Sequence, residues 1–312
     1  MNPEVTLDLS PDVRGALDRS APIVALESSV FAQGLPIPAN ADAAKRMAGA
    51  VVSRGAIPAI TAISRGRPTV GLSGDDLTRF LCRDGVQKVS SRDMGVAMAR
   101  RLDGATTVAA TLVLARRAGI EVFATGGIGG VHRRGRRELA ESPQVRDESA
   151  DLLELAKSAV VVVCAGAKSI LDLPATWERL ETLGIPVIGY QTNELPGFFT
   201  AETGIPVHVR CDTAQEIAAM ARSHWSLRNI QSVLVVQPPP ARHALSGMEM
   251  ERAVSEAISE AESNGIEGPA MTPFLLSAVS RLTNGRSLEV NVDLLENNAA
   301  LAAEIACAFA AR

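Results

Sequence analysis

Residues 159–169, AVVVVCAGAKS, are the stretch that decides the fold. Six apolar residues in a row, four of them valine, predict a strand at 159–164 that is covered on both faces of a sheet. A predicted helix at 150–158 precedes this strand, and another at 175–183 follows it. This alternation of strand and helix is typical of an α/β protein built around a mainly parallel sheet.

The same alternation extends along the chain in both directions. Further strands are predicted at 23–26, 120–124, 185–190, 206–210 and 232–236. A tight Arg65-Gly66 turn joins strands at 59–63 and 67–72, which implies some antiparallel pairing. Three helices, at 248–263, 273–283 and 291–310, close the chain, and they favour an open mixed sheet over a (β/α)8 barrel. Since no linker or repeat divides the sequence, we predict one domain over residues 1–312.

Two helix starts carry polar signals. Asn40 is predicted to cap an alanine-rich helix that Gly55 ends. The segment Gly104-Ala105-Thr106-Thr107 is predicted to begin a helix at 106–118.

Composition excludes several classes of protein. The chain has 312 residues, of which 46% are hydrophobic and 21% charged, so it is not disordered. Its net charge is −4 and only 3% of its residues are aromatic, which argues against binding to nucleic-acid polymers. No apolar run is long enough to span a bilayer, and the four scattered cysteines suggest neither disulfides nor a zinc site. We therefore expect a cytoplasmic protein whose partners are small molecules, not membranes.

Lysine is rare in this chain, which makes each lysine worth inspecting. Of 31 basic residues only Lys45, Lys88, Lys157 and Lys168 are lysines. Lys168 follows the most apolar strand, with only small residues between, and we expect it to be partly desolvated and so nucleophilic. The alternative is a lysine that reaches out to solvent.

Polar residues cluster where other predicted strands end. Glu27, directly after a buried strand, is either a general acid or base or a loop cap. The segment 88–93, KVSSRD, together with the helix start at 104–107, offers cations, hydroxyls and free N–H groups for a phosphate. Ordinary helix capping is the alternative. Because strand ends meet at one edge of a parallel sheet, we expect these groups to lie together.

Two further segments are candidates for ligand binding. Four glycines at 126–130 either let a ligand approach the backbone closely or form a plain turn that ends near His132. The carboxylates at 147–151, DESAD, either hold a divalent cation through oxygen or mark a helix start that Ser149 caps.

The sequence resembles the pseudouridine-5′-phosphate glycosidase family over residues 10–310. The motifs that carry the resemblance are ALESSV, GAIPA, KVSSRD, GATTVAAT, VFATGGIGGVHR, ESADL, VVCAGAKSILDLP, IGYQT, TPFLL and VNVDLLENNAALAAEIA. The resemblance implies an α/β/α sandwich assembled as a homotrimer. It also implies reversible cleavage of the C–C glycosidic bond of pseudouridine 5′-phosphate to uracil and ribose 5-phosphate, with a manganese ion.

The resemblance also implies roles for individual residues. Lys168 matches the nucleophile and Glu27 the proton donor. Asp147 matches the manganese ligand. The substrate-binding positions that match are Lys88, Val108, Ser149, Ala150, Asp151, Thr125, His132 and Asn291.

The chemistry needs these residue types. A carbon leaving group is far poorer than the oxygen or nitrogen of other glycosides, which leave through an oxocarbenium-like transition state. A lysine that attacks C1′ opens the ribose ring and forms an imine, so that the bond to the base can break or form. A carboxylic acid then donates and accepts the protons of these steps, and groups that bind the phosphate position the substrate.

Two departures from the family pattern leave the aglycone open. Gln33 stands where the family usually has histidine, and the segment between His132 and Asp147 is longer than usual. One alternative is therefore a C-ribosyl synthase that joins ribose 5-phosphate to another acceptor in a natural-product pathway. The other alternative is a non-catalytic paralogue that only binds phosphosugars; retention of Glu27, Asp147 and Lys168 argues against it.

Overall fold

The computed structural model describes residues 6–133, 147–241, 244–266 and 271–311. Its strands are β1 (Asp8–Leu9), β2 (Ile23–Glu27), β3 (Ile57–Ser64), β4 (Arg67–Val70), β5 (Gln87–Val89), β6 (Gly104–Thr106), β7 (Val122–Ala124), β8 (Val161–Cys164), β9 (Val187–Tyr190), β10 (Val209–Cys211) and β11 (Val233–Val236). Its α-helices are α1 (Pro11–Asp18), α2 (Ala39–Ser53), α3 (Gly74–Cys82), α4 (Met94–Ala99), α5 (Val108–Ala118), α7 (Ala150–Leu155), α8 (Leu173–Thr182), α9 (Ala214–Ser226), α10 (Gly247–Ser263), α11 (Met271–Leu282) and α12 (Arg286–Ala310). Two short helical turns are η1 (Val30–Gly34) and η2 (Ser91–Asp93).

Within these residues the strands form one open mixed sheet. Its main path runs in the order β1-β4-β3-β2-β7-β8-β11-β9-β10. Off this path, β6 pairs with β3, and β5 pairs with β6. Only the pairs β3–β4 and β3–β6 are antiparallel. The predicted α/β fold and the 59–72 hairpin are therefore confirmed, and the barrel alternative is wrong because the sheet does not close.

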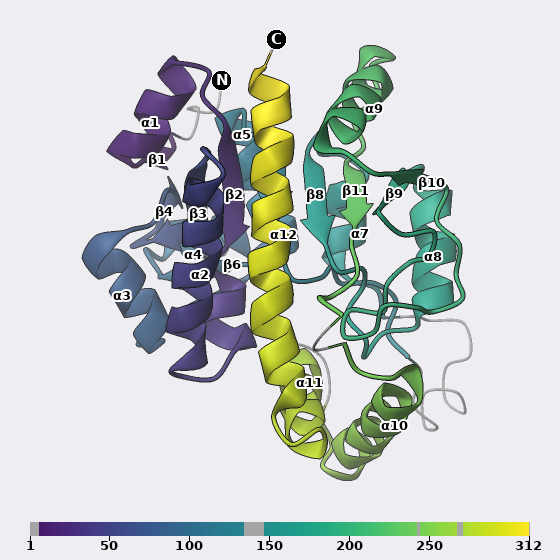
Figure 1. The fold of residues 1–312 in the computed structure, drawn as a ribbon. Coiled ribbons are helices and arrows are strands. Elements are labelled where there is room, and N and C mark those ends of the chain that lie inside the picture. The colour runs from purple at the N-terminus through teal and green to yellow at the C-terminus, as the bar shows by residue number, and fades with distance from the viewer. Residues whose placement is uncertain (1–5, 134–146, 242–243, 267–270, 312) are drawn as a thin grey trace.

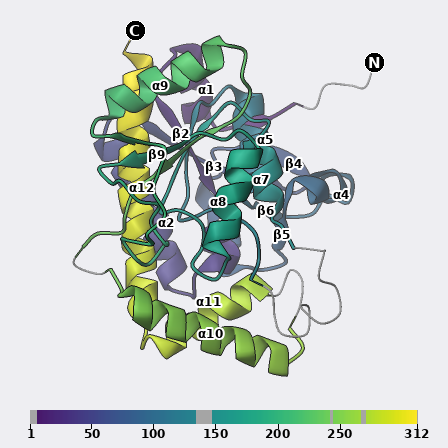
Figure 2. The same ribbon diagram turned by 90° about the vertical axis from the view of Figure 1, so that its right-hand side faces the viewer.

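Helices cover both faces of the sheet, as the resemblance implied. The long α12 lies along the face shown in Figure 1, beside α2 and α9, and α5 and α7 lie on the opposite face (Figure 2). Val160, Val161, Val162, Val163 and Cys164 are fully buried between these layers. The molecule is a three-layer α/β/α sandwich. The helices α10 and α11 lie below the carboxyl ends of the strands (Figure 1).

Three local predictions are corrected by the structure. Gly104–Thr106 is the strand β6, and the helix that follows begins at Val108 with Thr107 as its N-cap. A Cβ on Gly104 would meet Val89 at 2.5 Å, so glycine lets β6 pack closely against β5. Asn40 lies inside α2, not at its cap, and its amide donates to the carbonyls of Phe31 and Leu81. The last helix begins at Arg286, earlier than predicted.

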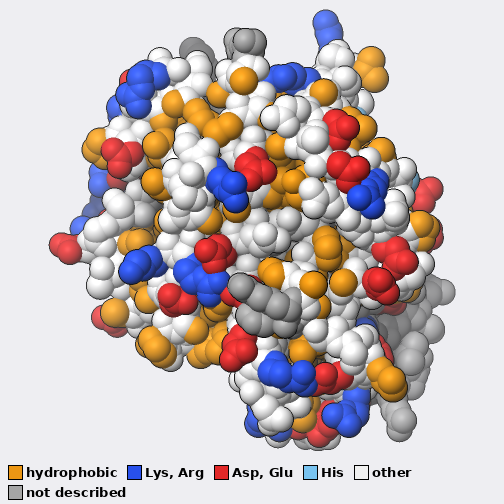
Figure 3. All heavy atoms as spheres, viewed as in Figure 1, with side chains coloured by type: hydrophobic (Ala, Val, Ile, Leu, Met, Phe, Trp, Pro, Cys, Tyr) orange, Lys and Arg blue, Asp and Glu red, His pale blue; other side chains and the backbone are white. Residues whose placement is uncertain are grey.

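The mixture of charges on the surface is consistent with the small net charge of −4. On the face that carries α12, acidic and basic side chains are interspersed with apolar ones (Figure 3). No helix in the described ranges is both long and apolar enough to cross a bilayer.

Candidate active site

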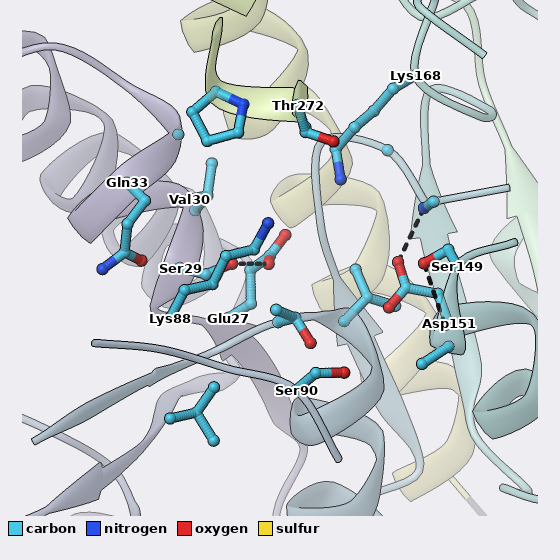
Figure 4. A pocket seen from close by; sticks show the side chains of 18 of the residues that line it. Glu27, Ser29, Val30, Gln33, Lys88, Ser90, Ser149, Asp151, Lys168 and Thr272 are labelled. Atoms are coloured by element: carbon cyan, nitrogen blue, oxygen red, sulfur yellow. Dashed lines mark hydrogen bonds between the residues drawn. The ribbon is translucent and has the colours of Figure 1, made fainter. Parts of the chain in front are cut away.

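A pocket of about 870 Å³ opens at the carboxyl ends of the central strands. The ends of β2, β5 and β8 and the glycine loop after β7 contribute to it, and α11 closes one side. Figure 4 shows Glu27, Lys88, Asp151 and Lys168 around this space. This is where open α/β sheets place their ligands, because loops from neighbouring strands converge there.

Glu27 is the last residue of β2 and is 5% exposed. Ser29 Oγ donates to Glu27 Oε2 at 2.7 Å, and Thr125 Oγ1 donates to Oε1. Burial raises the pKa of Glu27, while the positive charge of Lys168 and the two hydroxyl donors oppose that rise. A carboxyl group with a raised pKa keeps its proton to higher pH than usual, which suits a general acid.

Thr125 lies beneath Glu27 instead of lining the pocket. Its hydroxyl holds the Glu27 carboxyl, and its backbone carbonyl accepts from Asn298 Nδ2 at 2.8 Å. The predicted substrate contact of Thr125 therefore becomes an indirect one, through the carboxyl that it orients.

Lys168 lies in the loop after β8 and points into the pocket (Figure 4). Gly166, with φ of 90°, turns the chain there, and a Cβ at that position would meet the Pro196 carbonyl at 2.2 Å. The backbone N–H of Lys168 donates to Ile128 of the glycine loop at 3.1 Å. Lys168 is half-buried, so the structure places it on the pocket wall and not at the protein surface.

The proposed phosphate-binding groups also meet in this pocket. Lys88 of β5 and Val108, the first residue of α5, both line it. Although part of Lys88 is open to solvent, the protein around its ammonium lowers its pKa, and Lys168 lowers it further. Thr107 Oγ1, at the N-terminus of α5, is buried and has no hydrogen-bond partner within the described residues. A cation and a helix N-terminus together suit an anionic group.

The segment 149–151 begins α7, and its polar groups bond mainly to the protein. Ser149 caps the helix by accepting from the N–H of Asp151 at 3.2 Å. Asp151 is 5% exposed; its Oδ1 accepts from Ala109 N–H at 2.9 Å and its Oδ2 from Gly129 N–H at 2.8 Å. Asp151 thus ties the start of α5 to the glycine loop. Ala150 lines the pocket between them.

The glycine loop lines the pocket and is at the same time close-packed against protein on its other sides. A Cβ on Gly129 would meet Ser149 Oγ at 2.2 Å, and one on Gly130 would meet Thr176 Oγ1 at 2.4 Å. The glycines let the loop pack against α7 and α8, and parts of their backbone still line the pocket.

The remaining predicted residues lie on the pocket wall and rim. His132 lines the pocket, and its N–H donates to the Asp147 carbonyl at 2.9 Å. Asp147 is exposed at the rim, and the described residues hold no cluster of three or more His, Cys, Asp or Glu side chains suited to a metal. Asn291 of α12 is 7% exposed, and its Oδ1 has no partner among the described residues. All the predicted site residues except Thr125 therefore line one pocket.

Sequence reasoning missed part of the wall. Thr272, Pro273 and Leu276 of α11 line the pocket, and so does Phe198, whose backbone has a φ of 68°. The TPFLL motif was part of the family resemblance, but its residue types did not predict that α11 lines the pocket. Ser29, which donates to Glu27, could have been found from the sequence, because it lies two residues after the carboxylate.

A buried carboxyl group and two lysines that meet in one pocket, at the carboxyl ends of the parallel strands β2 and β8, define the site of an α/β enzyme. A model of the family described as "Indigoidine synthase A like protein" matches residues 12–308. The chain belongs to this family.

Relatives with the name pseudouridine-5′-phosphate glycosidase match the chain over nearly its full length. One from Gemmatimonas aurantiaca is 57% identical and covers 94% of this chain and 93% of its own. One from Herpetosiphon aurantiacus is 48% identical and covers 97% and 98%. The resemblance found in the sequence motifs is thereby confirmed.

Two solved structures share the fold over almost the whole chain. The prealnumycin C-glycosynthase AlnA in complex with ribulose 5-phosphate is 39% identical, with a TM-score of 0.89 and coverage of 99% of this chain and 98% of its own. An indigoidine synthase A-like protein from Thermotoga maritima is 36% identical, with a TM-score of 0.86 and coverage of 97% and 96%.

Proposed function

We propose that this enzyme is a pseudouridine-5′-phosphate glycosidase, which cleaves the C–C glycosidic bond of its substrate to give uracil and ribose 5-phosphate, reversibly. The observation that carries the proposal is the meeting of Glu27, Lys88 and Lys168 in one pocket. These three side chains supply an acid, an anion-binding cation and a nucleophile. The names of the relatives at 48–57% identity support the same reaction.

The proposed reaction begins at Lys168. Its Nζ attacks C1′, so that a C–N bond forms, the bond from C1′ to the ring oxygen breaks and the oxygen takes a proton. The nitrogen loses a proton, and its lone pair then forms an imine while the C1′–C5 bond breaks and C5 of the base takes a proton. Water adds to the imine and releases ribose 5-phosphate and the free lysine. The net reaction adds one water to the substrate.

Glu27 is the group that we propose moves these protons. Its raised pKa favours the protonated form, and Ser29 and Thr125 fix the carboxyl in place. General acid catalysis of this kind contributes about 10²–10⁴-fold. Lys88 and the start of α5 hold the phosphate, so the reacting carbon stays near Lys168.

A manganese ion at Asp147 is part of the proposal. Asp147 gives one exposed carboxylate at the rim, next to the pocket. That donor suits a hard divalent cation that keeps most of its waters and binds through one or two carboxylates. When bound, the ion would supply positive charge near the substrate. EDTA treatment should lower activity, and Mn²⁺ or Mg²⁺ should restore it; full activity in metal-free protein would contradict this role.

Asp147→Asn separates metal binding from other functions of this residue. We expect the variant to bind Mn²⁺ more weakly than the parent in calorimetry, with thermal stability unchanged. Unchanged Mn²⁺ affinity would leave Asp147 as a helix-start carboxylate.

A C-ribosyl synthase with another acceptor is the second candidate. The observation in its favour is Gln33, whose Oε1 is buried in the pocket wall without a partner among the described residues. The likeness to AlnA, a C-glycosynthase, points the same way. The long segment after His132, the other departure from the family pattern, falls at 134–146 and lies outside the described residues. The non-catalytic alternative has less support, since the acid and the nucleophile share one pocket.

One incubation distinguishes these functions. Pure protein with ribose 5-phosphate, uracil and Mn²⁺ should form pseudouridine 5′-phosphate, detected by mass spectrometry. Product only with larger aromatic acceptors would favour the C-ribosyl synthase. No product with any acceptor, and no cleavage of pseudouridine 5′-phosphate, would favour the non-catalytic alternative.

The setting of the enzyme is also a proposal. A phosphorylated substrate and the free thiols of Cys82, Cys164, Cys211 and Cys307 suit the reducing cytoplasm. The homotrimer implied by the resemblance can be tested by light scattering, in which a monomer mass of 32.8 kDa would contradict it.

A further inference from the structure

Arg133 links the loop that carries Lys168 to the helix α10. Its Nε donates to the carbonyl of Leu171 at 3.0 Å, and its Nη2 donates to the carbonyl of Ser169 at 3.4 Å. Its Nη1 donates to Glu251 Oε1 of α10 at 2.6 Å. One guanidinium therefore holds two backbone carbonyls just after Lys168 and is itself anchored at a third point.

Backbone bonds hold the loop on both sides of Lys168, and the side after it carries side-chain bonds as well. Before it, backbone bonds join the loop to the glycine loop, from Ala165 N–H to Gly126 and from Lys168 N–H to Ile128. After it, the N–H of Asp172 donates to the Val131 carbonyl at 2.9 Å, and Ser169, Ile170 and Leu171 are at most 4% exposed. Buried carbonyls need partners, and Arg133 supplies two of them from its side chain.

An arginine suits this task better than a lysine does. The guanidinium is planar and carries five donors in a fixed fork, so it can bond two carbonyls and a carboxylate at once. Arg133 lowers the pKa of Glu251, which keeps that carboxylate charged and the anchor intact at neutral pH.

We propose that Arg133 is a positioning residue for the reaction: it fixes the backbone after Lys168 so that Nζ meets C1′ at the right place. Neither the motifs nor the relatives assign it this role. The inference rests on the proposed function, since it takes Lys168 as the nucleophile. Glu251 takes part by orienting the guanidinium from α10.

Arg133→Ala tests the proposal. A misplaced nucleophile costs rate more than binding, because the phosphate is held by Lys88 and α5 on other elements. We expect kcat, and the rate at which borohydride traps ribose 5-phosphate on Lys168, to fall about 10- to 100-fold. The KM for the phosphorylated substrate should stay within a few-fold of the parent.

Two milder variants keep the test informative if Arg133→Ala fails to fold. Arg133→Lys retains the charge and at least one donor and should recover part of the lost rate. Glu251→Gln removes the ionic anchor and should give a smaller loss in kcat. Parental trapping rates in both variants would overturn the proposal, as would a change confined to KM.

Arg281→Ala is the matched control. Arg281 of α11 pairs with Glu260 of α10, so its loss removes a similar ion pair without touching the Lys168 loop. Its trapping rate should equal that of the parent. If the parent protein itself forms no adduct on Lys168, the proposed function fails; if the parent forms the adduct and Arg133→Ala forms it equally fast, only the role of Arg133 fails.

Discussion

The floor and the wall of the pocket differ in how their polar groups are satisfied. On the floor, Glu27 accepts from two hydroxyls, and Asp151 accepts from two backbone N–H groups. On the wall, Gln33, Thr107 and Asn291 each bury an oxygen that lacks a partner in the described part of the chain. Buried polar atoms are normally bonded, so unpartnered ones in a pocket are suited to bond a water or a ligand there. The side chains of the floor are thus held in place by the protein before a substrate binds, whereas those of the wall keep oxygens that can bond to a bound molecule.

Loss of the nucleophile should have the largest effect. Lys168→Ala should abolish both borohydride trapping of ribose 5-phosphate and turnover, by at least about 10³-fold, because the proposed imine forms on its Nζ. Peptide mapping of the parent adduct should locate it in the AGAKS segment. Lys45→Ala, which changes an exposed lysine outside the pocket, should trap and turn over normally. An adduct on another lysine would contradict the mechanism.

Glu27→Gln should have the next largest effect, a drop in kcat of about 10²–10⁴-fold. The pH profile adds a sharper test. Because burial raises the pKa of Glu27, the acid form is lost only as pH rises through that raised value, and parental kcat should fall there. The variant should lack this descending limb. If Glu27→Gln keeps it, another group is the acid.

Lys88→Ala should weaken binding on the wall while leaving the floor intact. Loss of one charge-assisted contact to the phosphate costs about 1.5–3 kcal/mol, or on the order of 10- to 100-fold in affinity. Calorimetry should show this loss for pseudouridine 5′-phosphate and little change for pseudouridine. Equal losses for both ligands would place Lys88 away from the phosphate.

Substitution of two asparagines on α12 compares the floor with the wall within one helix, and it should have the smallest effects of these predictions. Asn298 is fully buried and bonds to Gln237 Nε2 and the Thr125 carbonyl, whereas Asn291 leaves its Oδ1 unpartnered. Asn298→Ala should lower the free energy of unfolding by about 1–3 kcal/mol, because it orphans both partners. Asn291→Ala should cost less stability and raise KM several-fold. Thermal unfolding and kinetics of both variants test this, and the reverse pattern would undo the distinction between floor and wall.

Local pattern was enough to find the fold class and the candidate polar segments of the site, and the resemblance to the family gave the individual residues their roles. The valine run of β8 predicts a doubly covered strand, because a short apolar run rich in β-branched residues suits a strand that is buried on both faces. Glu27 and Lys168 could be singled out because each ends or follows a buried strand, and Lys88 because it stands among hydroxyls and a second cation in KVSSRD. Parallel strands bring Glu27 and Lys168 to one edge of the sheet whatever the strand order. Lys88 lies on β5, which runs antiparallel to β2, and its place at the pocket depends on the pairing of β6 with β3.

The strand order itself was decided by the tertiary structure. β2 lies beside β7, although Glu27 and Thr125 are 98 residues apart, and that pairing turns Thr125 into a support for Glu27. The same holds for the glycine loop, whose glycines serve packing against Ser149 and Thr176.

Sequence determined the chemical groups of this protein, and tertiary structure decided their partners. Periodicity and turn chemistry report on neighbours along the chain, so they locate strands, caps and the residues at strand ends. They hold no information on which distant segments pack together. Such distant segments meet where α11 lines the pocket, where Asn298 bonds to Thr125 and where Arg133 bonds to the loop that carries Lys168. These contacts form only when the helices pack against the sheet.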